Sequence, residues 1–350
     1  MSPTRSTEAA VLFSTTEPLR LITLELPPLA PGQVLVDVAY SGVCHTQLGE
    51  ARGRRGPDRF LPHAMGHEAA GAVAEVGAGV TKVQPGDPVV VSWIRGSGAY
   101  VPSTVYPSSD GPINSGAVTT FMRRTITCES QVTRIDAAMP LRAAALLGCA
   151  VPTGAGAVLN NAGAKPGDSV AVIGVGGVGL CAVLGARLVH ANPIIAVDIV
   201  ELKLNQARAA GATHVINARE QDPLQAIRDI TGGRGVDYAI EASGRVEAME
   251  MALAAVRNGG GLCVLAGNPP FGQKMSVDPF DLIRGKRIIG SWGGGAQPDR
   301  DIPMYAQLHL TGELHLEALD TQEFALGGVN DALEALEQGR LGRALLNMGA

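Results

Sequence analysis

The stretch Ser169–Leu180 reads SVAVIGVGGVGL, an uncharged apolar run that passes into a glycine-rich turn. Its start is typical of a buried β-strand, and the run Leu180–Val189 that follows is compatible with a helix. The glycines permit a tight turn, let the backbone approach a pyrophosphate and place the N-terminus of the helix opposite the phosphates. The turn residues that we assign to the cofactor are Gly174, Gly176, Gly177, Val178 and Gly179.

An acidic residue stands where such a unit needs one. The next expected strand, Ile194–Val197, ends at Asp198, nineteen residues after Gly179. A carboxylate there accepts hydrogen bonds from the ribose hydroxyls of adenosine and repels a 2′-phosphate, so NAD is predicted rather than NADP. Lys203 is predicted to help hold the ribose, with a solvated helix charge as the alternative. For the whole motif, the alternative is a glycine turn that only packs a strand against a helix.

From about Val151 onward, strand-like and helix-like stretches alternate, and the strands end in Gly or Asp. This alternation predicts a doubly wound parallel sheet, whose ligand crevice lies where the strand order reverses. We therefore assign residues 151–293 to a dinucleotide-binding domain. The expected strands are Ser169–Ile173, Ile194–Val197, His214–Ile216, Val236–Ile240, Leu262–Leu265 and Arg287–Ile289.

The chain before this domain consists of short apolar and β-branched runs separated by Pro- and Gly-rich turns, which predicts a β-rich domain. After it, Gly293–Gly295 is interpreted as a hinge, and the tail from Gln297 carries a helix, a short strand and the helix Gly328–Gln338. We expect the tail to fold back, so that residues 1–150 and 294–350 form one domain. The strands expected in the first part include Val34–Tyr40, Ala69–Val76, Val89–Trp93 and Thr119–Thr127. The predicted fold class is therefore α/β plus β.

The composition favours a small-molecule partner. Hydrophobic residues make up 46% of the 350 residues and charged residues 17%, with 45 Gly and 22 Pro, which excludes a disordered or coiled-coil chain. The net charge of −5 gives no attraction to nucleic acid or to anionic lipid. The segment Ser169–Ala186 carries no charge, but glycines interrupt it, so no membrane span is predicted.

The cysteines and the N-terminus suggest a reducing compartment. Five cysteines without a close CxxC pair make a disulfide framework improbable. The first twenty residues lack the apolar core of a secretory signal. We therefore expect a cytoplasmic protein.

Three residues are candidate metal ligands, although no local motif joins them. Cys44, His67 and Cys149 lie in separate turns spread over 105 residues. Taken singly, each has an ordinary interpretation as a buried thiol or a hydrogen-bonded turn histidine. Pro62 and Gly66 argue against a helical His-x-x-x-His zinc pair at 63 and 67, so a hydrolase is disfavoured.

Together with their neighbours, these residues resemble a known family. The motifs are Gly42-Val43-Cys44-His45-Thr46, Gly66-His67-Glu68-x-x-Gly71, Gly148-Cys149 with Pro152-Thr153-Gly154, and Leu341-Gly342-Arg343. They are similar to those of the zinc-dependent medium-chain alcohol dehydrogenases, with the class III, formaldehyde-dehydrogenase-like members nearest. The likeness spans nearly the whole chain, and it implies a GroES-like β domain interrupted by a Rossmann domain.

The resemblance also implies a site and a chemistry. Cys44, His67 and Cys149 would hold one catalytic zinc with an open position, and Glu68 would serve as an occasional fourth ligand. Zinc polarises the oxygen of an alcohol or carbonyl substrate, and hydride passes between substrate and NAD. The remaining implied roles are proton relay for Thr46, cofactor phosphate contacts for His45 and Arg343, and substrate-pocket lining for Trp93. The family also implies a homodimer or homotetramer, formed through the sheet edge near Arg287–Trp292.

The chain departs from the family at three places. Residues 92–116 contain no cysteine, so a structural zinc is not expected, and we expect ordinary packing to hold that lobe. Gln47 replaces an Asp that usually accepts a hydrogen bond from the zinc-ligating histidine, and Gly49 replaces a histidine of the proton relay. These changes leave open a zinc- and NAD(P)H-dependent reductase of an imine or activated alkene. A non-catalytic nucleotide-binding homologue is the other alternative.

Overall fold

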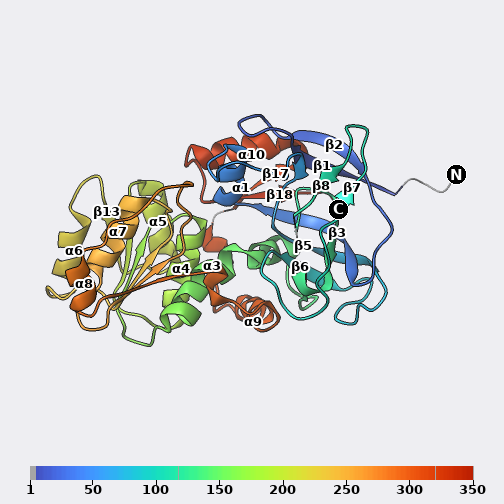
Figure 1. Cartoon of the computed structure of the whole chain (residues 1–350). Helices are drawn as coiled ribbons and strands as arrows, with labels where there is room; N and C mark the ends of the chain where they lie inside the picture. Colours follow the sequence, from blue (N-terminus) through green and yellow to red (C-terminus); the bar gives the residue numbers. More distant parts are fainter. Residues whose placement is uncertain (1–4, 117, 320, 350) are drawn as a thin grey trace. The chain divides into compact units, whose positions relative to one another are not determined.

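The computed structural model describes residues 5–116, 118–319 and 321–349; the outermost residues of the predicted β-rich domain, 1–4 and 350, lie outside this description. The chain forms two compact units. One runs up to Cys149 and includes Gln297–Thr311 and the chain from Thr321 onward. The other consists of Ala150–Ala296 and the segment from Gly312. We describe each unit separately (Figure 1).

The second unit contains a six-stranded parallel sheet with the strand order β13-β12-β11-β14-β15-β16. Its strands are β11 Val170–Ile173, β12 Ile194–Asp198, β13 His214–Asn217, β14 Tyr238–Glu241, β15 Leu262–Leu265 and β16 Arg287–Gly290. All six predicted strands are confirmed, with ends that differ by one or two residues. The order reverses between β11 and β14, so the ligand crevice is expected at their carboxyl ends.

Helices cover this sheet as in a doubly wound fold, with α4 in contact with α5 and α6 in contact with α7. The helices are α3 Ala150–Gly156, its π-helical continuation Ala157–Ala162, α4 Gly177–Leu188, α5 Glu201–Ala210, α6 Pro223–Ile230, α7 Val246–Ala255 and α8 Pro279–Ile283. Two glycines of the turn are needed here: Gly174 has φ +84°, and a Cβ on Gly179 would lie 1.9 Å from the carbonyl oxygen of Gly174. A side chain at Gly179 would push α4 away from the turn after β11, whereas one at Gly174 would be strained and would lie 2.6 Å from Ser243 Cβ.

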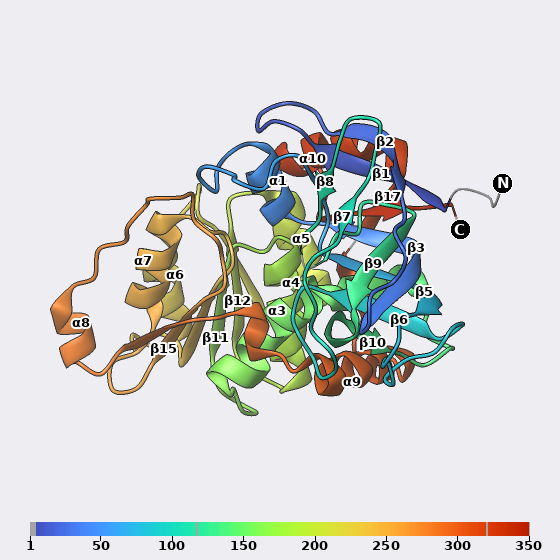
Figure 2. The same cartoon turned by 45° about the vertical axis from the view of Figure 1, so that its right-hand side comes forward.

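The first unit is built from two sheets, of order β2-β1-β4-β8-β7 and β10-β6-β5-β3-β18-β17, with β9 also paired to β3. Figure 2 shows β9 beside β3. The long strands are β1 Ser6–Leu12, β2 Arg20–Glu25, β3 Gln33–Val43, β5 Glu68–Val76, β6 Pro88–Ser92, β9 Arg124–Cys128, β17 Thr321–Ala325 and β18 Arg343–Asn347. The short strands are β4 His63–Ala64, β7 Val105–Tyr106, β8 Ile113–Asn114 and β10 Val132–Arg134. Its α-helices are α1 His45–Ala51, α2 Leu141–Ala144, α9 Pro298–Leu310 and α10 Val329–Glu337.

Three expectations need correction. The strand expected over Thr119–Thr127 begins only at Arg124, because the preceding residues turn to bond with Met65. The tail contains a strand that the sequence analysis missed, β18, which pairs antiparallel with β3. Gly293–Gly295 forms a 3₁₀ turn in which a Cβ on Gly294 would lie 1.9 Å from the carbonyl oxygen of Pro152, so this glycine packs tightly and is not a loose hinge.

In the described part of the chain, no single helix has both the length and the apolar character that crossing a membrane requires. One bent pair, Leu141–Gly148 with Ala150–Ala162, meets those criteria by length and composition alone.

Candidate metal centre and cofactor site

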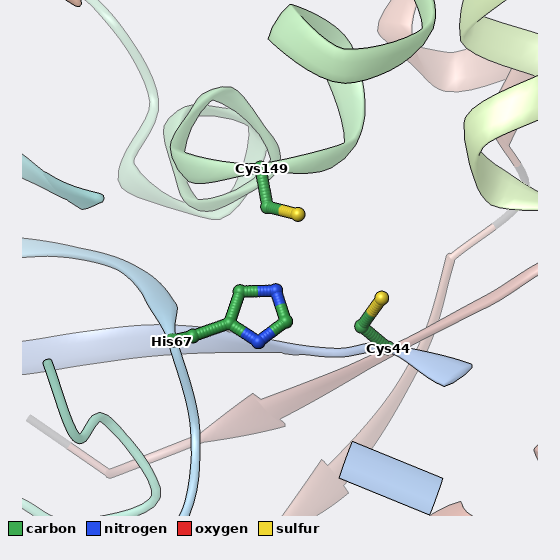
Figure 3. Close-up of side chains that lie close together, drawn as sticks. All are labelled: Cys44, His67 and Cys149. Atoms are coloured by element: carbon green, nitrogen blue, oxygen red, sulfur yellow. The ribbon is translucent and has the colours of Figure 1, made fainter. Parts of the chain in front are cut away.

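Three side chains from distant parts of the sequence converge in the first unit. Cys44 follows β3 and precedes α1, His67 directly precedes β5, and Cys149 follows a 3₁₀ turn. One donor atom from each side chain lies within 4.8 Å of the donor atoms of the other two (Figure 3). Both thiols are buried, each residue being 6% exposed. The structure therefore brings together the three predicted zinc ligands.

The donors suit a zinc ion. His67 Nε2 is buried and has no hydrogen-bond partner among the described residues, so its ring nitrogen is available for a metal. The Cys149 thiol lowers the pKa of the Cys44 thiol; burial opposes this, and His67 and Arg343 lower the pKa further, to well below its ordinary value. Thiolate is the form that binds metals, and two sulfurs with one imidazole favour zinc and leave a fourth position open.

The Gln47 amide contacts two of these residues. Its Oε1 accepts a hydrogen bond of 3.1 Å from the backbone N–H of Cys44, and its Nε2 contacts His67 Nδ1. Gln47 is 2% exposed, so the contact is buried. An amide is neutral, whereas the carboxylate usual at this position would carry a negative charge beside the imidazole. This confirms that Gln47 faces His67.

Glu68 and Arg343 contact each other beside the metal centre. The guanidinium of Arg343 forms a buried ion pair with the Glu68 carboxylate, and the two residues are 3% and 0% exposed. Among the described residues, the group with metal-binding spacing does not include Glu68. The occasional fourth-ligand role expected for Glu68 and the phosphate contact expected for Arg343 stay predictions.

The other expected residues near the metal centre are positioned as follows. The Cys44 Sγ lies 3.8 Å from the Thr46 hydroxyl, so this hydroxyl borders the donor group. Trp93 is half-buried, and its backbone N–H donates to the His67 carbonyl over 3.1 Å. His45 is the exposed first residue of α1. Thr46 and Trp93 are therefore adjacent to the ligands through direct contacts.

In the second unit, the Asp198 carboxylate is hydrogen-bonded to the backbone of the glycine turn. Its Oδ2 accepts a 2.9 Å hydrogen bond from the N–H of Val175, and its Oδ1 accepts from the N–H groups of Ile199 and Val200. The expected ribose-binding carboxylate thus also fixes the turn that would receive the pyrophosphate. Lys203 lies in the first turn of α5 and is half-buried. The bracing role was missed, because sequence spacing predicts only the contact with the ribose.

Two carboxylates, of which Glu129 is buried and Asp299 is exposed, hold the lobe after Trp93, where ordinary packing was expected. Glu129, 3% exposed, accepts backbone hydrogen bonds from Thr81, Lys82 and Ala99 over 2.6–2.8 Å. Asp299 accepts a 2.6 Å hydrogen bond from the N–H of Ser97 and pairs with Lys82. Nothing in the sequence marked Glu129 or Asp299, because both lie far from this segment in the chain.

Comparison with known proteins agrees with this geometry. Residues 30–136 match the alcohol dehydrogenase GroES-like domain, and residues 177–309 match the zinc-binding dehydrogenase domain. The chain is 34% identical to an S-(hydroxymethyl)glutathione dehydrogenase of Synechocystis sp., over 97% of this chain and 99% of the relative. A protein of the same name from Escherichia coli O157:H7 is also 34% identical, over 97% of this chain and 98% of its own.

Two solved structures resemble the whole chain. An alcohol dehydrogenase zinc-binding domain protein from Burkholderia ambifaria superposes with a TM-score of 0.91 at 32% identity, covering 99% of both chains. Benzyl alcohol dehydrogenase from Acinetobacter calcoaceticus gives 0.89 at 30% identity, covering 98% of this chain and 99% of its own. The combination of sulfur and nitrogen donors, a glycine turn and these matches shows an NAD(H)-using oxidoreductase that belongs to the zinc-dependent medium-chain alcohol dehydrogenase family.

Proposed function

We propose that this enzyme moves hydride between NAD(H) and an alcohol/carbonyl pair, with the substrate oxygen activated at Cys44, His67 and Cys149. The observation that carries the proposal is the convergence of these buried donors from three separate segments. When bound, zinc supplies the Lewis acidity that makes an alcohol acidic near neutral pH, and NAD supplies the hydride acceptor.

The chain's own residues then have the following proposed roles. The Thr46 hydroxyl, beside Cys44, accepts the alcohol proton and passes it on. Trp93, tied to the His67 carbonyl, lines the substrate pocket. His45 faces the cofactor phosphates, which suits a donor side chain at an exposed helix start. Glu68 as an occasional fourth zinc ligand and Arg343 as a contact to the cofactor phosphates are also proposed, and each role requires their ion pair to open.

The dinucleotide is proposed to bind the second unit. Its pyrophosphate is placed on the N-terminus of α4, at the turn that contains Gly174, Gly176, Gly177, Val178 and Gly179. Asp198, aided by Lys203, is proposed to accept hydrogen bonds from the adenosine ribose and to favour NAD over NADP. We propose the domain boundaries 1–150 with 294–350 for the catalytic domain and 151–293 for the cofactor domain.

A second reaction class has specific support. The neutral amide of Gln47 contacts His67 and cannot raise the basicity of the imidazole as a carboxylate would. Gly49 offers no proton-accepting side chain. A site of this kind suits the reduction of an imine or an activated alkene with NAD(P)H, in which little alcohol acidity is needed.

The deciding experiment is a substrate panel followed at the NADH absorbance band, with the zinc content of the same preparation measured. The panel contains simple primary and secondary alcohols, an enal, an imine, and benzyl alcohol and S-(hydroxymethyl)glutathione, because the relatives are named for the last two. Turnover of an alcohol with NAD supports the leading proposal. Turnover of only an enal or imine with NAD(P)H supports the second, and purified protein without tightly held zinc would refute both.

We also propose a cytoplasmic homodimer or homotetramer. None of the five cysteines forms a disulfide, which suits a reducing compartment. In the second unit, β16 ends the sheet, and apolar side chains there and on α8 are exposed, including Ile283 at 72% and Trp292 at 80%. An exposed apolar sheet edge favours pairing with a second copy. Light scattering should show an oligomer that Trp292→Glu weakens, and a monomeric parent would contradict this.

A further inference from the structure

The strand β6 ends at the metal centre, and its last residue, Ser92, contacts the backbone beside a proposed ligand. The Ser92 hydroxyl donates to the Gly148 carbonyl over 2.6 Å, directly before Cys149, and accepts from the N–H of Ile94 over 3.0 Å. The side chain is buried, with the residue 1% exposed. A buried hydroxyl with both a donor and an acceptor partner is held in one orientation.

The next residue is bonded to a second ligand segment. Trp93 donates its backbone N–H to the His67 carbonyl over 3.1 Å, and Ser92 lies opposite Glu68 in the pairing of β5 with β6. The end of β6 is therefore hydrogen-bonded to the segment that carries His67 and to the segment that carries Cys149.

The backbone before Cys149 rests directly on this pair of strands. A Cβ on Gly148 would lie 2.6 Å from the carbonyl oxygen of Val91 and 2.7 Å from Glu68 Cβ. Glycine permits this close approach, and the Ser92 hydroxyl fixes where along the strand the carbonyl lies.

We propose that Ser92 is a positioning residue that sets the separation of the Cys149 sulfur from the His67 ring, and thereby the affinity for zinc. The inference rests on the proposed metal site. Its physical basis is that ligand spacing must match bond lengths of about 2.3 Å to sulfur and about 2.0 Å to nitrogen. Partners that orient ligands in this way are typically responsible for about 10-fold to 100-fold in metal affinity.

The test compares Ser92→Ala with the loss of an equivalent buried hydrogen bond elsewhere in the unit. In the same unit, Thr125 is fully buried and donates its hydroxyl to the Thr119 carbonyl over the same 2.6 Å, so Thr125→Val removes an equivalent bond away from the ligands. Ser92→Thr keeps the hydroxyl. For each full-length protein, the zinc dissociation constant is measured by chelator competition, and the sulfur-to-metal charge-transfer absorption is recorded with Co²⁺ as the probe.

We expect Ser92→Ala to weaken zinc binding by about 10-fold or more and to alter the Co²⁺ spectrum, while Thr125→Val changes neither and Ser92→Thr restores both. Unchanged zinc affinity in Ser92→Ala, or an equal loss in both hydroxyl-deletion variants, would overturn the inference. A parent protein that binds no zinc would instead refute the proposed function, so the two failures are distinguishable.

Discussion

The metal centre and residues 95–104 of the lobe lie in the same unit. They differ in whether the buried polar groups beside them have protein partners. At the metal centre, His67 Nε2 is buried and has no hydrogen-bond partner within residues 5–116, 118–319 and 321–349. In the lobe, the oxygens of Glu129 accept backbone N–H donors from Thr81, Lys82 and Ala99. Because buried polar groups are costly unless they are paired, an unpaired one indicates a missing ligand, whereas a paired one stabilises the fold.

The largest effect is expected from removing a donor at the metal centre. Cys44→Ser should lower turnover by about 1,000-fold or more, equivalent to about 4 kcal/mol, because the Lewis acid is lost. NADH binding, measured by fluorescence, should be nearly unchanged, because the glycine turn, Asp198 and Lys203 lie in the other unit and the substitution leaves His45 in place. Retained turnover would show that the chemistry does not depend on this donor group.

In the lobe, a substitution should lower the stability of the fold and leave the metal centre unchanged. Glu129→Gln should lower the free energy of unfolding by about 2 kcal/mol, because one charged acceptor of backbone N–H groups is replaced by an amide. Zinc affinity should stay the same. Urea denaturation and limited proteolysis within residues 95–104 measure the change, with exposed Glu17→Gln as the matched control. Equal stability of the two variants would show that the hydrogen bonds to Glu129 do not stabilise the lobe.

The hydrogen bonds to Glu129 also predict how the free energy of unfolding depends on pH. Burial raises the pKa of Glu129, but the N–H groups of Ala99, Thr81 and Lys82 outweigh this and bring it below its ordinary value of 4.5. A lowered pKa contributes stability that is complete above the ordinary value and is lost as pH falls through the folded value. The parent should therefore lose more unfolding free energy than Glu129→Gln between about pH 7 and about pH 3. Parallel pH profiles would refute this.

The smallest effect is expected at the contact between Gln47 and His67. Gln47→Glu has the same shape but offers two acceptor oxygens, one for the Cys44 N–H and one for the imidazole N–H. Zinc should be held about 10-fold more tightly, as measured by chelator competition. Weaker binding would show that the neutral amide is the better partner in this chain.

The two units also differ in how far their sequence predicts them. All six parallel strands and the Gly174–Gly179 turn follow from local patterns, because each strand and its turn are contiguous in the chain. The metal ligands required resemblance to a family, since Cys44 and Cys149 meet only in the folded chain. Ser92, Glu129 and strand β18 were missed, because their partners are distant in sequence and no local pattern identifies them.

The bond from the Val175 N–H to Asp198 matters for anyone who wishes to change the coenzyme preference. Exchanging Asp198 for a small neutral residue would make room for a 2′-phosphate but would also remove the acceptor that shapes the glycine turn. Asn at this position keeps an oxygen for Val175 while removing the negative charge, and it loses only the bonds from Ile199 and Val200, which lie outside the glycine turn. An engineered NADP enzyme built on this chain should therefore start from Asp198→Asn and add a cation nearby, so that recognition and turn geometry are changed separately.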